Sequence, residues 1–164
     1  MSGIDFTVGV VVERPPGEFL MIEERVAGQA VLTQPGGHLE AGESLAAAVE
    51  RETLEESGCR VRTRRLIELY QWYDEAKHCH YLRAMYAAEL LEQKDGARLD
   101  EGVVGVRWMT RAEIDGEIHR HRNPVVQRVL HDYLRGRRID DSRLDVVLRA
   151  ESDVATVRHI ATRL

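Results

Sequence analysis

The chain has few cysteines, no long apolar run and no excess of positive charge. Its 164 residues contain two cysteines, Cys59 and Cys79, which we expect to be reduced thiols. No apolar run approaches the roughly 18 residues that a transmembrane helix needs, and the first residues lack the basic stretch and apolar core of a signal peptide. The net charge of −5 gives no general attraction for nucleic acid. We therefore expect a cytoplasmic protein with no membrane partner, and the charge disfavours a nucleic-acid partner.

What is present is an ordinary globular composition, 43% hydrophobic and 31% charged. A chain of this length favours a single domain. Apolar and β-branched runs predict strands at 6–13, 18–25, 31–33, 61–73, 80–91 and 103–109. The turn at 14–17 joins the first two strands into a predicted hairpin.

Three segments predict helices. Ser44 is a good N-cap for residues 44–57, and Gly58 is a good C-cap. Thr110 and Glu113 form a capping box that opens a short helix. A further helix is expected to begin with Pro124 at its first position and to end at Gly136. Beyond it, residues 144–148 could form a strand and 154–164 a helix capped by Asp153.

The most informative stretch is the glycine-containing segment 37–43 and the helix that follows it. At ~100° per residue, one stripe of that helix is apolar in its first two turns and acidic in its last. Its members are Leu45, Ala48, Val49, Glu52, Glu55 and Glu56. Like charges at these spacings each cost roughly 0.2–0.5 kcal/mol, and the C-terminal end of a helix favours cations. A compensating cation is expected, and Mg²⁺ prefers such oxygen ligands.

A solvated acidic helix end closed by a glycine is the structural alternative. The full constellation, however, resembles the signature of the Nudix hydrolases. The matching residues are Gly37, Glu43, Arg51, Glu52, Glu55, Glu56 and Gly58. Thr53 and Cys59 depart from the pattern, since the family usually has larger aliphatic residues there, and this affects local packing more than chemistry.

The resemblance implies an α/β (α+β) Nudix fold, in which a mixed β-sheet is sandwiched between α-helices. It assigns residues 1–136 to the Nudix domain and leaves 137–164 as a C-terminal extension, packed on the domain or at an interface. A monomer or a homodimer is expected.

The resemblance also implies a metal-dependent hydrolase, in which water attacks phosphorus at a carboxylate-bound Mg²⁺, with Mn²⁺ as a possible substitute. The expected ligands are Glu52, Glu55, Glu56 and the carbonyl of Gly37. The expected catalytic set is Glu55, Glu56, Arg51 and Glu101.

Within this set, Arg51 would orient Glu55 by an i,i+4 salt bridge, and Glu43 would orient Arg51. Gly58 is structural. The general base could be a helix glutamate or a loop carboxylate, Asp100 or Glu101, for which a solvated turn is the alternative.

The flanking residues resemble the NudJ-type Nudix phosphatases, which act on nucleoside di- and triphosphates and thiamine-related pyrophosphates and tend to release orthophosphate. This likeness rests on four segments, 34–40 (which includes His38), 71–72, 81–83 and 107–108. A tryptophan often precedes the Pro-Gly-Gly run in Nudix proteins, whereas Leu32-Thr33-Gln34 stands here.

Four residues are expected to bind substrate: Arg83, Trp72, Tyr81 and His38. Arg83 lies between apolar neighbours in a strand, so it needs either a phosphate or a structural salt bridge. Trp72 and Tyr81 could stack on a planar base or belong to the core. Strand alternation prevents Trp72 and Tyr73 from facing the same pocket.

The family signature leaves other substrates open. Dinucleoside polyphosphates or nucleotide sugars are the first alternative, and a non-catalytic Nudix-like ligand-binding regulator is the second. Removal of a 5′ pyrophosphate from RNA is a third, which the acidic net charge disfavours.

Overall fold

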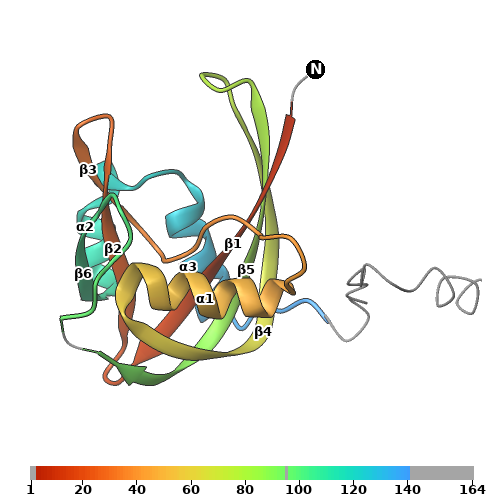
Figure 1. The fold of residues 1–164 in the computed structure, drawn as a ribbon. Coiled ribbons are helices and arrows are strands. Elements are labelled where there is room, and N and C mark those ends of the chain that lie inside the picture. The colour runs from red at the N-terminus through yellow and green to blue at the C-terminus, as the bar shows by residue number, and fades with distance from the viewer. Residues whose placement is uncertain (1–2, 95, 141–164) are drawn as a thin grey trace, which may run out of the picture.

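The computed structural model describes residues 3–94 and 96–140, which form a mixed sheet with helices on both faces (Figure 1). The strands are β1 (Gly3–Arg14), β2 (Glu18–Val26), β3 (Gln29–Thr33), β4 (Cys59–Asp74), β5 (Cys79–Gln93) and β6 (Val103–Thr110). The helices are α1 (Leu45–Ser57), α2 (Arg111–Gly116), the 3-10 helix η1 (Ile118–Arg120) and α3 (Val125–Leu134). Among these described residues, no helix is long and apolar enough to cross a membrane.

The strands and helices predicted within the described residues are confirmed, apart from details at their ends. α3 is assigned from Val125, one residue later than predicted, although Pro124 before it already has helical dihedrals. The side chain of Asn123 accepts the N–H of Val125 at 3.0 Å, as a residue that caps a helix beginning at Pro124 would. That helix ends at Leu134, two residues before Gly136. The predicted strand at 144–148 and helix at 154–164 lie outside the described residues.

The sheet has the order β3-β2-β1-β5-β4, with β6 paired to β2. β1 and β5 run parallel, and the other paired strands run antiparallel, so the sheet is mixed as expected. The predicted hairpin of β1 and β2 is confirmed, but the two strands pair only near their turn, at Glu13–Phe19 and Arg14–Glu18. Beyond that point they separate.

The loop between β3 and α1, residues 34–44, is called here the glycine loop. It runs along the edge of β1 beyond the point where β1 and β2 stop pairing. The N–H of Val8 donates to the carbonyl of Gly37 at 2.9 Å, and the N–H of Val10 donates to the carbonyl of Pro35 at 3.1 Å. Gly36 has a φ of +148°, and a Cβ there would lie 2.2 Å from the carbonyl oxygen of Val8. A side chain therefore cannot fit between loop and strand.

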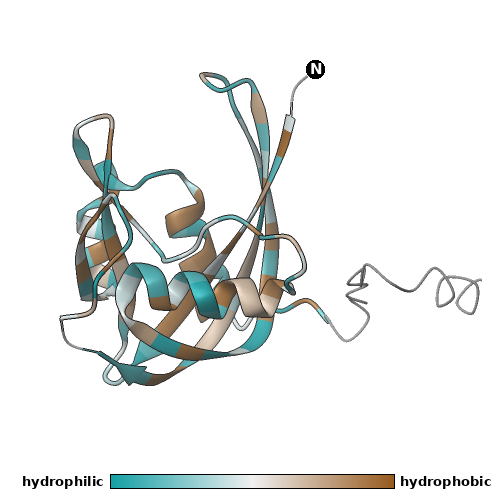
Figure 2. Cartoon of the chain, in the orientation of Figure 1, coloured by the Kyte–Doolittle hydropathy of each residue, from teal (hydrophilic) through white to brown (hydrophobic). Residues whose placement is uncertain are grey.

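Helices cover both faces of the sheet, as the predicted sandwich requires. Alternation along β1 sends Val8, Val10 and Val12 to the face under α1, and Val11 to the face under α2 and α3. In Figure 1, α1 crosses in front of the strands, and α2 and α3 lie behind them. Figure 2 shows hydrophilic residues in the C-terminal half of α1, with apolar positions in the strands behind it.

The described part of the C-terminal extension, residues 137–140, contacts the domain. The N–H of Ile139 donates to the carbonyl of Leu66 at 3.0 Å, and the Ile139 side chain packs against the core beneath α1. The domain boundary, the remainder of the extension and the oligomeric state stay predictions.

We expect Gly36→Ala to destabilise the fold by at least about 3 kcal/mol, because its Cβ would overlap two backbone groups that cannot move apart cheaply. Gly42→Ala is the matched control. Gly42 also has a positive φ, +85°, but it faces open space, so that change should cost only about 1 kcal/mol. Urea unfolding of both variants measures the difference. Equal losses would show that the loop does not need the close approach at Gly36.

Candidate functional site

The acidic last turn of α1 faces the loop that contains Gly36 and Gly37, and Glu52 and Glu56 are buried there. Its N-terminus is capped as expected, since the Ser44 side chain accepts the N–H of Ala47 at 3.1 Å. Gly58 ends the helix with a φ of +69°, and its N–H donates to the carbonyl of Leu54. No basic residue lies in the last turn, so no lysine or arginine there offsets its carboxylates.

Arg51 joins this helix to the loop. Its guanidinium contacts Glu43 at 2.7 Å, Glu52 at 2.8 Å and Glu55 at 3.1 Å. It also donates to the carbonyl of His38 at 3.0 Å. The hydrogen bond from Arg51 lowers the pKa of Glu43, and the same pairing raises the pKa of Arg51. Arg51 is therefore fixed by its partners and holds two acidic side chains in place.

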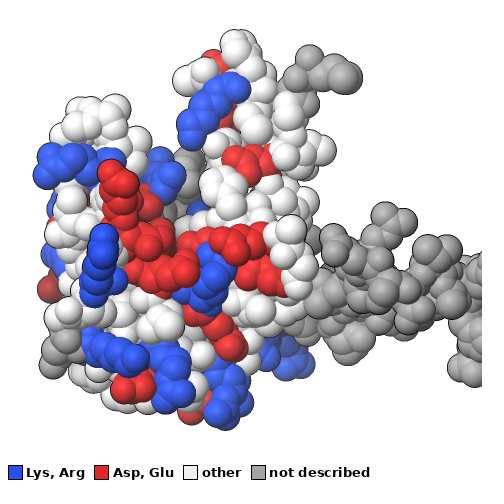
Figure 3. Space-filling view, in the orientation of Figure 1, with Lys and Arg blue, Asp and Glu red and all other residues white. Residues whose placement is uncertain are grey.

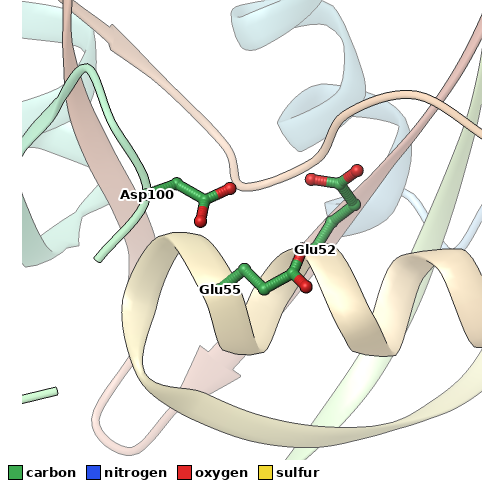
Figure 4. A group of neighbouring side chains, drawn as sticks. All are labelled: Glu52, Glu55 and Asp100. Carbon is green, nitrogen blue, oxygen red and sulfur yellow. The ribbon is translucent and has the colours of Figure 1, made fainter. Parts of the chain in front are cut away.

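Three carboxylates meet beside α1. Ligand oxygens of Glu52, Glu55 and Asp100 all lie within 4.8 Å of one another. Figure 4 shows Glu52 and Glu55 on α1, with Asp100 approaching from the loop before β6. The backbone N–H of Asp100 donates to the carbonyl of Glu55 at 3.1 Å, which fixes that loop against the helix. Such an all-oxygen donor set fits Mg²⁺ or Mn²⁺.

Glu56 is the most deeply buried of the three helix glutamates in this acidic turn. Its carboxylate accepts the N–H of Gly36 at 2.7 Å. Burial raises its pKa to about 8, and burial also raises the pKa of Glu52. Two neighbouring acids that are costly to ionise would gain most from a bound cation.

These acids line one wall of a cavity of about 420 Å³. Figure 3 shows acidic side chains gathered over α1 along the edge of a hollow. Glu52, Glu56 and Asp100 contribute to this cavity from one side, and Trp72 and Tyr81 contribute from the β4–β5 hairpin.

Trp72 and Tyr81 are cross-strand partners that stack on each other. Their ring centroids are 5.0 Å apart and their planes differ by 8°. Lys77 donates to the Tyr81 hydroxyl at 3.0 Å. Tyr73 points to the opposite face, where its ring contacts His80, so the expected alternation is confirmed. The stacked pair presents a flat aromatic surface at the cavity.

Arg83 is buried in the same cavity without a carboxylate partner. Its side chain is 8% exposed and donates only weakly, to the carbonyl of Gln34 at 3.4 Å and to the sulfur of Met85. No acid of the described residues lies within 4.0 Å of it, so the structural salt bridge allowed by the sequence is not formed. Burial lowers its pKa to about 10.

The remaining predicted residues lie in different surroundings. His38 lines the cavity, with its Nε2 3.0 Å from Asp5. The Gly37 carbonyl accepts the Val8 N–H, and a Cβ on Gly37 would meet the Glu52 carboxylate at 2.4 Å. Glu101 is exposed and does not line the cavity, so the structure does not bring it to the other site residues.

Sequence reasoning missed several cavity residues. Thr7 comes from β1, Glu24 from β2, and Arg122 and Asn123 from the segment before α3. No local motif marks these positions, because strand pairing brings Thr7 and Glu24 to the cavity and the path of the segment before α3 brings the other two. The sequence offers both Asp100 and Glu101 as loop carboxylates, and their spacing alone does not tell which of the two faces α1.

Comparisons with known proteins give one consistent result. The NUDIX domain family matches residues 4–129. Phosphatase NudJ of Escherichia coli strain K12 is 35% identical over 132 residues, which is 80% of this chain and 84% of that protein. A NUDIX hydrolase structure from Nitrosomonas europaea is 32% identical, with a TM-score of 0.81, and covers 91% of this chain and 99% of its own.

A more distant solved structure shares the fold alone. The Ap4A hydrolase of C. elegans has a TM-score of 0.63 at 18% identity, covering 80% of this chain and 96% of its own.

In EDTA, the free energy of unfolding should fall as the pH rises from about 5 to about 8, by at most about 1.4 kcal/mol per pH unit. The reason is that the unfolded chain ionises Glu56 near pH 4.5, whereas the folded chain keeps it protonated up to about 8. Glu56→Gln keeps an acceptor for the Gly36 N–H and should flatten this dependence. Denaturant titrations across the pH range measure it, and identical slopes in both proteins would contradict the buried, protonated Glu56.

Proposed function

The chain belongs to the Nudix hydrolase family, whose members act on phosphoric anhydrides, and on that premise we propose its substrates. We propose that it hydrolyses nucleoside di- or triphosphates, or thiamine-type pyrophosphates, with Mg²⁺ at the carboxylate cluster and Mn²⁺ as a substitute. The observation that carries this proposal is the meeting of Glu52, Glu55 and Asp100 beside a cavity that contains an unpaired arginine.

Each side chain of the cluster has a part in the proposed reaction. A bound Mg²⁺ would act as a Lewis acid and lower the pKa of a coordinated water. Glu52, Glu55 and Asp100 would hold it, with Glu56 and the Gly37 carbonyl as further donors. Arg51 keeps Glu52 and Glu55 oriented. Water adds to phosphorus as the anhydride P–O bond breaks, and the leaving phosphate oxygen takes the electron pair.

For the loop carboxylate we propose Asp100 in place of Glu101. Asp100 lies within the cluster, close enough to the helix acids to accept the proton of the attacking water. Glu101, the next residue, is exposed outside the cavity. The assignment thus moves by one residue from the sequence prediction.

The rest of the cavity supports a substrate with a ring and a phosphate chain. Arg83 offers unpaired N–H donors to a phosphate oxygen. The stacked Trp72 and Tyr81 offer a surface for a base or a thiamine ring, worth ~1–3 kcal/mol for a stacked base. A volume of about 420 Å³ suits a small molecule. Likeness to a protein named Phosphatase NudJ favours release of orthophosphate.

A non-catalytic regulator is disfavoured, because all three glutamates of the helix signature are present.

Both thiols are free, Cys59 buried and Cys79 partly buried, which supports our proposal of a reducing location, the cytoplasm.

The substrate class is tested by a Mg²⁺-dependent hydrolysis panel with separate assays for phosphate and pyrophosphate. The panel contains nucleoside di- and triphosphates, thiamine pyrophosphate, a nucleotide sugar and a dinucleoside polyphosphate. We expect orthophosphate from the di- and triphosphates or from thiamine pyrophosphate. Activity on the last two compounds alone would keep the Nudix chemistry but overturn the proposed substrates. No turnover of any compound by folded protein would favour the regulator.

The proposed roles of the acids are tested by three substitutions. Asp100→Asn and Glu56→Gln should each lower kcat at saturating Mg²⁺ by at least about 100-fold, because each removes a carboxyl group that would bind the metal or accept the proton of the attacking water. Glu101→Gln, a neutralisation one residue away, is the matched control and should stay within about twofold of wild type. Circular dichroism and thermal melts confirm folding. If Glu101→Gln is the impaired variant instead, the loop assignment fails.

A further inference from the structure

A second group of polar side chains lies on the sheet itself, away from α1. Thr7 of β1 and Arg83 of β5 are partners in the parallel register, so both side chains leave the same face of the sheet. Both line the cavity, and both are more than nine-tenths buried, with exposures of 5% and 8%. The sheet therefore supplies a hydroxyl and a guanidinium side by side.

Among the described residues, neither side chain finds partners for its full hydrogen-bonding capacity. The Oγ1 of Thr7 is buried and has no hydrogen-bond partner. The Arg83 guanidinium has only the long contact to the Gln34 carbonyl and the contact to the Met85 sulfur. Burying a hydrogen-bond donor without a partner is unfavourable, and burying an unpaired charge is more so. Two such groups together point to an acceptor that comes from outside the chain.

The space around Arg83 is kept open by two glycines. A Cβ on Gly9 would lie 2.7 Å from the guanidinium, and a Cβ on Gly36 would lie 2.8 Å from it. Further along the same face, β5 changes from Arg83 to Met85 and Ala87, which belong to the apolar core under α2 and α3. Thr7 and Arg83 therefore lie at the end of the apolar core on this face of the sheet. Their positions are fixed by the pairing of β1 with β5.

We infer that Thr7 and Arg83 form a phosphoryl-binding subsite separate from the carboxylate cluster. Both groups can donate hydrogen bonds, and the pair carries one positive charge, so a phosphate oxyanion is the matching ligand. This inference rests on the proposed function in one respect, that the phosphoryl group belongs to the substrate. A diphosphate would then be bound at both ends, by metal at the α1 wall and by Thr7 and Arg83 on the sheet.

The charges that face this subsite come from three elements. Glu56 and Glu52 of α1 and Glu24 of β2 act on Arg83 through space, as does Arg122 before α3. Arg122 is itself paired with Glu24. The negative charge is therefore concentrated on the α1 wall and at Glu24, and a phosphate bound between the two sites would contact donors on one side and metal on the other.

Inorganic phosphate is the probe, since it is not hydrolysed. Isothermal titration with wild type, Thr7→Val and Thr7→Ser is carried out both in Mg²⁺ and in EDTA. Valine removes the hydroxyl with little change in shape, whereas serine keeps it. We expect wild type and Thr7→Ser to bind phosphate within about twofold of each other, and Thr7→Val to bind about tenfold more weakly in both buffers.

A second variant tests whether Arg83 serves binding or folding. Arg83→Met should abolish phosphate binding while leaving the melting temperature unchanged or higher, because it removes an unpaired buried charge. A lower melting temperature would show that the charge is structural, and would overturn the inference. So would equal phosphate binding by wild type and Thr7→Val, or wild-type binding that disappears in EDTA, which would assign phosphate to the metal.

These outcomes are separable from the proposed function. If the hydrolysis panel gives no turnover but Thr7→Val still weakens phosphate binding, the subsite stands and the substrates are wrong. If turnover is as proposed but Thr7→Val binds phosphate normally, the reaction stands and the subsite is wrong, with ordered water as the partner of Thr7.

Discussion

The pairing of the glycine loop with the edge of β1 is the constraint on which the site depends. Two backbone hydrogen bonds, from Val8 and Val10, place the loop where β2 has separated from β1. That position brings the Gly36 N–H to Glu56 and the His38 carbonyl to Arg51. Glu56 and Arg51 are thus held by backbone groups whose own positions are set by the sheet, and a shift of the loop would disturb both contacts together.

Charge balance explains why the acidic turn of α1 can exist without a basic partner in the same turn. Arg51 contacts four carboxylates, but it carries a single positive charge. Asp100 adds another negative charge from a different loop. The pKa values of Glu52 and Glu56 are raised chiefly by burial, and the charges of neighbouring acids raise them further. The excess negative charge at this turn therefore favours a bound cation.

The sequence predicted the parts of the site that lie on one helix, because periodicity and capping are local. Glu52, Glu55, Arg51 and Gly58 could be placed from their spacing alone, and the burial of Arg83 followed from its apolar neighbours. Thr7 could not be found, since its importance depends on the register between β1 and β5, two strands more than 70 positions apart in the chain. The choice between Asp100 and Glu101 depended on the path of an irregular loop, which no periodicity describes.

The glycine loop also covers the edge of β1 that β2 leaves unpaired. A strand that leaves its neighbour exposes a row of N–H and C=O groups, which can recruit a strand from another molecule. In this protein the carbonyls of Pro35 and Gly37 occupy that row, and Gly36 has no side chain that would hold the loop away. The residues that position the site therefore also cover the edge of β1 against pairing with a strand of another molecule, so a substitution that displaces this loop would affect both the site and the resistance to aggregation.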